Sequence, residues 1–105
     1  MSSSSTPEVG ATFVNIIETA PETQQQVIDI LKEGTERVIS RMPGFISVTL
    51  YAARDGRHVI NLATWEHPED VRNVQTDPES AAFAKRTAQI AEATPGLYTV
   101  VGRYR

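Results

Sequence analysis

The chain has 105 residues, 40% of them hydrophobic, which is enough for one compact domain and too little for two. Its net charge of -3 lacks the basic footprint of a protein that binds nucleic acid or an anionic membrane, and the absence of cysteine excludes disulfides and thiolate sites. No apolar run approaches the roughly 20 residues that span a bilayer, and the N-terminus has no signal-peptide pattern, so we expect a cytoplasmic protein.

The N-terminal segment differs in composition from the rest of the chain. Residues 1–10 are rich in serine and poor in apolar side chains, so we expect a disordered tail. Residues 11–105 then form a single domain. Its first element is a strand over residues 12–17, where the side chains are mostly β-branched or aromatic.

A long helix is expected next. Pro21 is suited to a helix start, and apolar residues spaced by four and seven positions define one buried stripe, made of Val27, Leu31, Val38 and Met42. Pro43 and Gly44 then end the helix, because proline cannot continue it and glycine accepts the backbone of a helix terminus.

A β-hairpin is the strongest local signal in the chain. Residues 45–51 and 58–65 read as strands, and Asp55-Gly56 between them favours the positive φ angles of a tight turn. A short helix is expected to begin at Pro68, and a second one is expected to follow the Asp77 cap.

The C-terminal part completes the element order. We expect the last helix to run to about residue 93, Pro95-Gly96 to close it, and residues 97–104 to form the final strand. The order β-α-β-β-α-β predicts an α+β, ferredoxin-like two-layer domain with a four-stranded antiparallel sheet. In that topology the first and third strands are neighbours in the middle of the sheet.

Strand alternation predicts which polar side chains meet. Asn61 and Trp65 point to one face of the third strand, and Phe13 and Asn15 share a face of the first, so the two amides could converge. An unpaired buried amide costs about 1 to 3 kcal/mol, and such local inconsistencies tend to mark functional sites. A structural role remains the alternative, since buried amides often bond to backbone or ordered water and a strand tryptophan is often core.

These segments resemble the antibiotic-biosynthesis monooxygenase family. The resemblance rests on Thr-Phe-Val-Asn at residues 12–15, Met-Pro-Gly-Phe at residues 42–45, and Val-Ile-Asn-Leu-Ala-Thr-Trp at residues 59–65. The resemblance spans about residues 12–102. It is strongest to the cofactor-free members, which oxidise anthrone-type aromatic polyketides to quinones. The chain departs from some relatives at Val71, where they carry tyrosine.

The resemblance implies a site and an assembly. Asn15, Asn61 and Trp65 would be catalytic. Asn61 and Trp65 would donate to the substrate oxygen where negative charge develops, and Asn15 would orient the substrate or a water that carries the proton away. Aromatic side chains at Phe13, Tyr51 and Phe83 would bind the flat substrate. No cofactor or metal is implied, because the substrate enolate itself passes an electron to O2. Two sheets would pack face to face in a homodimeric α/β barrel.

Two alternatives stay open beside this one. A non-oxidative polyketide cyclase or isomerase could use the same amides, because hydrogen bonds to an enolate serve both chemistries. Haem-degrading relatives need a histidine on the later helix, and no histidine follows His67. A metal site is not expected, since His58 and His67 lack a carboxylate at ligand spacing.

Overall fold

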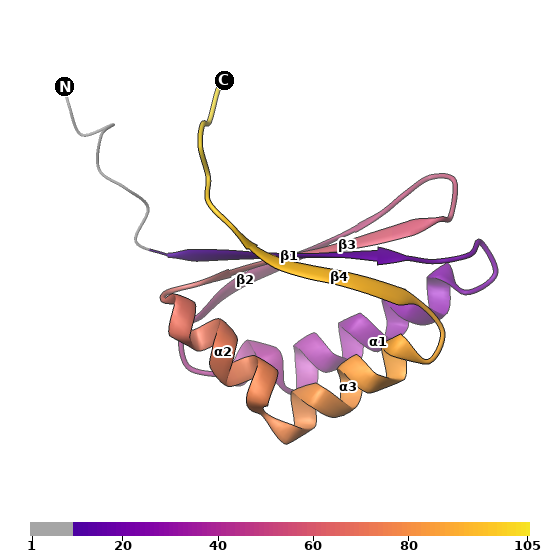
Figure 1. The fold of residues 1–105 in the computed structure, drawn as a ribbon, viewed down its shortest axis with the longest axis horizontal. Helices are drawn as coiled ribbons and strands as arrows, with labels where there is room; N and C mark the ends of the chain where they lie inside the picture. The colour runs from indigo at the N-terminus through magenta and orange to yellow at the C-terminus, as the bar shows by residue number, and fades with distance from the viewer. Residues whose placement is uncertain (1–9) are drawn as a thin grey trace.

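The computed structural model describes residues 10–105. They form two layers, one β-sheet and one layer of helices packed against it (Figure 1). Its elements in chain order are β1 (Ala11–Glu18), α1 (Gln24–Arg37), the 3-10 turn η2 (Ile39–Arg41), β2 (Phe45–Ala52), β3 (His58–Trp65), α2 (Pro68–Thr76), α3 (Pro78–Ala88) and β4 (Glu92–Tyr98). Apart from Gly10, the tail expected for residues 1–10 lies outside the described residues. Within residues 10–105, no helix is long and apolar enough to cross a membrane.

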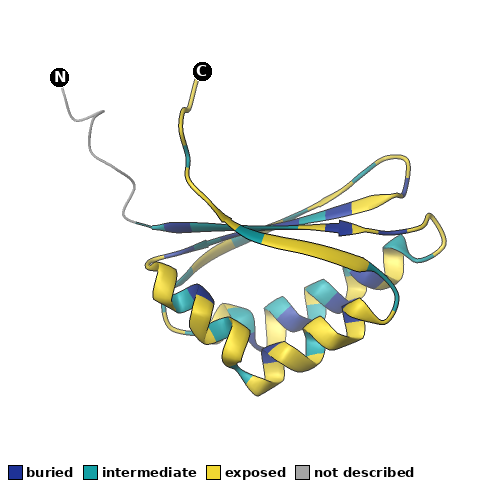
Figure 2. Ribbon diagram, in the orientation of Figure 1, coloured by how far each residue is buried: buried dark blue, intermediate teal, exposed yellow. Residues whose placement is uncertain are grey.

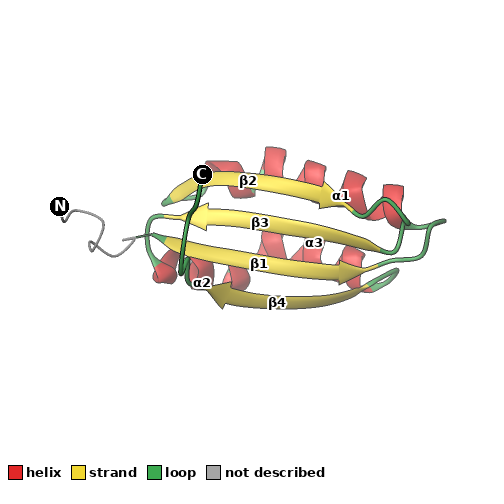
Figure 3. Ribbon diagram, turned by 90° about the horizontal axis from the view of Figure 1, so that it is seen from above, coloured by secondary structure: helices red, strands yellow, loops and turns green. Residues whose placement is uncertain are grey.

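The four strands form one antiparallel sheet in the order β2-β3-β1-β4. All three α-helices cover the same face of this sheet, and the opposite face carries no helix in the described part of the chain (Figures 1 and 3). The ferredoxin-like α+β architecture and the central pairing of β1 with β3 are therefore confirmed.

The hairpin between β2 and β3 forms where it was expected, but the backbone conformation of its turn differs from the expected one. Within this turn only Gly56 has a positive φ, of 79°, so the turn is not the two-residue type in which both central residues have positive φ. The Asp55 carboxylate instead accepts a hydrogen bond from the Arg57 backbone N–H at 2.9 Å. Thr19 donates to the Gly56 carbonyl at 2.8 Å and ties the turn to the end of β1.

The first helix is shorter than predicted at both ends. It begins at Gln24 rather than at Pro21, and its α-helical hydrogen bonding ends at Arg37. Val38 leaves helical geometry with φ of -126°, and the chain tightens into η2 before the Pro43-Gly44 turn. The prediction of a helix through Met42 was therefore wrong in its last turn, although Val38 is buried as expected.

The last strand was placed too late in the sequence. The final helix α3 ends at Ala88, and β4 covers residues 92–98 rather than 97–104. Pro95 and Gly96 lie inside this strand, where Pro95 pairs with Asn15 of β1. Proline is tolerated here because β4 is an edge strand, so no second neighbouring strand needs a hydrogen bond from the missing proline N–H.

The buried core residues form two separate groups between the sheet and the helices, and Figure 2 colours the buried positions of the ribbon dark blue. One lies near the start of β1 and the end of β3 and includes Trp65, Ala11, Ala63 and Val71. The other lies at the opposite ends of these strands and comprises Ile17, Val27 and Val59. The positions between the two groups on β1 and β3 carry asparagine, so the core is interrupted in the middle of the sheet.

Candidate active site

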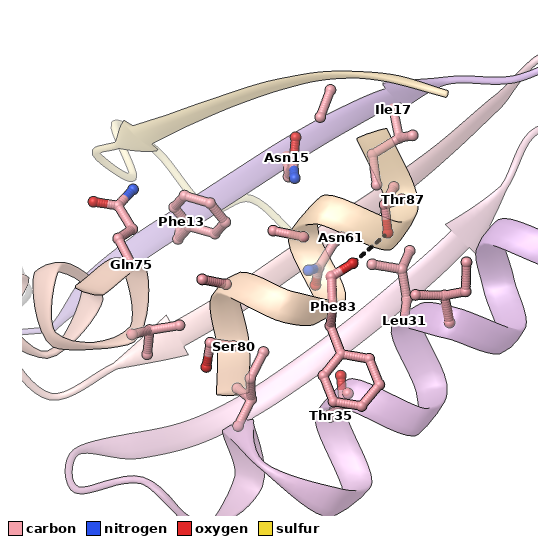
Figure 4. A pocket seen from close by; sticks show the side chains of 17 residues that line it. Phe13, Asn15, Ile17, Leu31, Thr35, Asn61, Gln75, Ser80, Phe83 and Thr87 are labelled. Atoms are coloured by element: carbon pink, nitrogen blue, oxygen red, sulfur yellow. Dashed lines mark hydrogen bonds between the residues drawn. The ribbon is translucent and has the colours of Figure 1, made fainter. Parts of the chain in front are cut away.

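A cavity of about 310 Å³ lies where the core is interrupted. Its floor is the helix-covered face of β1 and β3, and its walls come from α1, α3 and the end of α2 (Figure 4). This volume is at the lower end of the roughly 300 to 1,000 Å³ typical of small-molecule sites. Among the described residues, no charged side chain lines it.

Asn15 and Asn61 face each other across the two central strands. They are direct partners in the β1–β3 register, both line the cavity, and Asn61 is only 9% exposed. Side chains directly opposite in antiparallel strands have Cβ atoms about 4.5 to 5.5 Å apart. The predicted convergence of these two amides is therefore present in the structure.

Both amides have a buried oxygen without a hydrogen-bond partner. Within the described residues, the Oδ1 atoms of Asn15 and Asn61 are the buried side-chain oxygens that lack one. Leaving such an acceptor unpaired costs about 1 to 3 kcal/mol, so two of them side by side are unfavourable for folding alone. The pair is suited to a ligand that supplies hydroxyl donors to the oxygens and accepts from the amide N–H groups.

Other polar side chains on the wall divide into two kinds. Thr87 donates to the Phe83 carbonyl at 3.2 Å, and Ser80 contacts the Met42 sulfur at 3.8 Å, so both already have partners. In the described part of the chain, Thr35 and Gln75 have no side-chain hydrogen bond. These two can therefore bind polar groups of a ligand without breaking an existing contact.

The two phenylalanines predicted to bind substrate both line the cavity. Phe13 comes from β1, next to Asn15 on the same face, and Phe83 comes from the inner side of α3 (Figure 4). Phe13 and Gln75 also border a smaller hollow of about 140 Å³ beside β4, which is lined in addition by Arg72. The cavity therefore adjoins a more polar opening.

Trp65 and Tyr51 lie elsewhere. Trp65 is 2% exposed and packs edge-on against Phe45, with ring centroids 5.6 Å apart, and it is not on the cavity wall. Tyr51 pairs with Ile60, which points to the uncovered face, and it is 53% exposed. The structure therefore brings the two asparagines together with Phe13 and Phe83 and leaves the other two predicted residues outside the cavity.

Sequence reasoning missed most of the α1 and α3 wall. Ser80, Phe83, Ala84 and Thr87 recur at three- to four-residue spacing, which is the period of one helix face. The spacing is visible in the sequence, but small and hydroxyl-bearing side chains are also typical of an exposed helix face. Only the tertiary structure shows that this face lines the cavity. Gly34 is visible as a glycine inside the predicted helix, yet the sequence does not show which side chain packs against it.

Comparison with known proteins agrees with this geometry. The model of the family described as "Antibiotic biosynthesis monooxygenase" matches residues 11–86. The chain belongs to this family. The resemblance drawn from the strand motifs is thereby confirmed, and the match includes both asparagines, Phe13 and Phe83.

One curated relative is an enzyme of known name. The chain is 43% identical over 67 residues to tetracenomycin-F1 monooxygenase of Streptomyces glaucescens. This match covers 64% of the chain and 60% of the relative, so the similarity spans less than two thirds of that enzyme's length.

Two solved structures extend the similarity over nearly the whole chain. A monooxygenase from Streptomyces coelicolor, in complex with nanaomycin D, is 27% identical with a TM-score of 0.82, covering 99% of this chain and 98% of that one. SnoaB, a cofactor-independent oxygenase from Streptomyces nogalater, is 26% identical with a TM-score of 0.74, covering 90% and 95%. Both proteins are described as oxygenases, and SnoaB is described as cofactor-independent, as the resemblance implied.

Proposed function

We propose that this protein is a cofactor-independent monooxygenase that oxidises an anthrone-type aromatic polyketide to a quinone with O2. The observation that carries the proposal is the pair of amides, Asn15 and Asn61, with unpartnered oxygens in an otherwise mainly apolar cavity. The relatives support it, because their names include tetracenomycin-F1 monooxygenase and a cofactor-independent oxygenase.

The proposed reaction begins at the weakly acidic carbon of the anthrone. Loss of a proton there gives an enolate whose negative charge gathers on the oxygen across the ring system. The N–H groups of Asn15 and Asn61 stabilise that oxygen, as donors in a water-poor cavity do. Since no ionisable side chain among the described residues lines the cavity, the proton leaves through water or a polar group of the substrate.

Oxygenation then needs only the substrate and O2. The enolate gives one electron to O2, and the resulting superoxide recombines with the substrate radical to form a C–O bond and a peroxide. The peroxide collapses with cleavage of its O–O bond, so that one oxygen atom becomes the quinone carbonyl and the other leaves as water with the two hydrogens of the former methylene. Phe13 and Phe83 hold the flat rings of the substrate. The donor role of Trp65 stays a prediction, and the buried position of this side chain away from the cavity does not favour it.

We also propose that the active form is a homodimer. The sheet face without helices carries apolar side chains in register across three strands, with Ile16, Ile60 and Tyr51 in one row and Val14 and Leu62 in the next. Ile16 is 38% and Tyr51 53% exposed, and a contiguous apolar patch of this kind is typical of an interaction surface. A second copy of the same face would cover it. The cytoplasmic location stays a prediction.

The test is O2 consumption with dithranol, using chelator-treated protein and measuring quinone formation at the same time. We expect uptake above the spontaneous rate that survives chelation and falls about 100- to 1,000-fold in Asn61→Ala. Asn73→Ala is the matched control, because Asn73 is an exposed helix residue. Trp65→Phe asks whether the indole takes part.

The opposite result would favour the alternative chemistry. If the protein binds the anthrone and consumes no O2, the site would belong to a non-oxidative cyclase or isomerase that uses the same amides for an enolate. Loss of uptake after chelation would contradict the cofactor-independent reaction directly.

A further inference from the structure

Gly34 stands in the interior of α1, where glycine disfavours a helix relative to alanine. Its backbone does not require glycine, because only Gly44 and Gly56 have positive φ among the described residues. Gly34 is buried and lines the cavity. The reason for glycine must therefore lie in what packs against this position.

The neighbour is Phe83 of α3. A Cβ atom on Gly34 would lie 3.1 Å from the Cγ atom of Phe83 and 3.4 Å from its Cβ and Cδ1 atoms. The first distance is tighter than ordinary van der Waals contact, so the ring would have to move to make room. The missing side chain of Gly34 thus lets the Phe83 ring lie directly against α1.

Arg86 restricts the ring from outside. Its guanidinium carbon lies 5.2 Å from the Phe83 ring centroid, within cation–π range, and its Nη1 atom lies 3.4 Å from a carboxylate oxygen of Glu33. Glu33 precedes Gly34 in α1 and also pairs with Arg37 at 2.8 Å. Arg86 is half exposed, and Phe83 is half buried and lines the cavity, so the ring is in contact with α1, with the Arg86 cation and with the cavity.

We propose that Gly34 is a specificity-determining residue, because it allows Phe83 to pack against α1 and so sets the cavity width for flat ligands of three fused rings. Arg86 acts on this width through Phe83 and is a positioning residue. The inference rests on the proposed function for its substrate class. It predicts that one methyl group at position 34 pushes the ring toward the cavity and discriminates against wide ligands.

The experiment compares two quinones that are already at the oxidation level of the proposed product, danthron with three fused rings and juglone with two. Calorimetric Kd values are measured for the wild type, Gly34→Ala, the double variant Gly34→Ala/Phe83→Leu, and Lys32→Ala, an exposed control on the same helix. Because the chain has no cysteine, quinone addition to a thiol cannot disturb the titration.

We expect Gly34→Ala to weaken danthron binding about tenfold and juglone less than twofold, since one methylene in an apolar pocket discriminates by about that factor or more. The double variant should recover most of the loss, and Lys32→Ala should change neither Kd. If Gly34→Ala does not fold, Phe83→Trp, which narrows the cavity from the other helix, should give the same selective loss.

Equal effects on both quinones, no effect, or no recovery in the double variant would overturn the inference. A wild type that binds neither quinone would overturn it as well. The result is independent of turnover, so a selective loss of danthron binding without any O2 uptake would support the width inference and refute the proposed oxygenase.

Discussion

Replacing Asn61 by leucine should make the protein more stable and nearly inactive. Leucine has a similar size, and it removes a buried amide whose oxygen has no partner among the described residues. Replacing an unsatisfied polar group by an apolar one of similar shape is neutral or stabilising, in contrast to most core substitutions. The expected sign is therefore opposite to the usual one.

The magnitude follows from one unpaired acceptor. Leaving such a group buried costs about 1 to 3 kcal/mol, so the free energy of unfolding should rise by about 1 to 3 kcal/mol in Asn61→Leu. For a domain of this size each kcal/mol corresponds to roughly 4 to 8 °C in Tm. The rate of O2-dependent turnover should fall by about 100- to 1,000-fold, the effect of removing one oxyanion donor.

The assay is urea unfolding at fixed protein concentration, because dimerisation would couple stability to concentration. Asn73→Leu is the matched control, since Asn73 is exposed on α2 and its replacement should change stability by less than about 0.5 kcal/mol. A destabilised Asn61→Leu would refute the reasoning, because it would mean that the native amide has a partner and contributes to the fold.

Three further results are expected. The hydrogen bond from Arg37, which is the largest cause, and the nearby Arg86 lower the pKa of Glu33 below its usual value. The ionised Glu33 therefore stabilises the fold at neutral pH, and this stabilisation is lost as the pH falls through the lowered pKa. Arg37→Gln should raise the pKa of Glu33 in an NMR titration of its carboxyl carbon. Asp77→Ala should lower the unfolding free energy by about 0.5 to 2 kcal/mol, because the Asp77 carboxylate accepts from the Ser80 N–H at 3.0 Å at the start of α3. Leu62→Glu should give a monomer in light scattering, since it puts a charge on the uncovered sheet face.

Each of these has a control and a result that would contradict it. An unchanged Glu33 titration would mean that the Arg37 contact is absent in solution. Asp77→Asn keeps the acceptor and should retain most of the stability lost in Asp77→Ala. Gln26→Glu adds the same charge at an exposed helix position and should leave the assembly intact, and a dimeric Leu62→Glu would exclude this face as the interface.

Local chemistry in the sequence was sufficient for most elements. The β2–β3 hairpin follows from Asp55-Gly56, and α2 and α3 begin at Pro68 and Pro78, because turn and cap preferences act within a few residues. The convergence of Asn15 and Asn61 was also expected, since strand alternation gives each amide a face and the element order makes their strands neighbours, whereas the register that pairs them directly comes from the structure.

The sequence alone determined this protein's family, its element order and the two amides that face each other. Tertiary structure alone decided that β4 runs through Pro95 at a sheet edge, that Trp65 belongs to the core, and that Gly34 seats Phe83 beside the cavity. The physical reason is range. Turns, caps and alternation depend on neighbours in the chain, whereas edge position, burial and the space left for a ligand depend on which distant element packs against each residue.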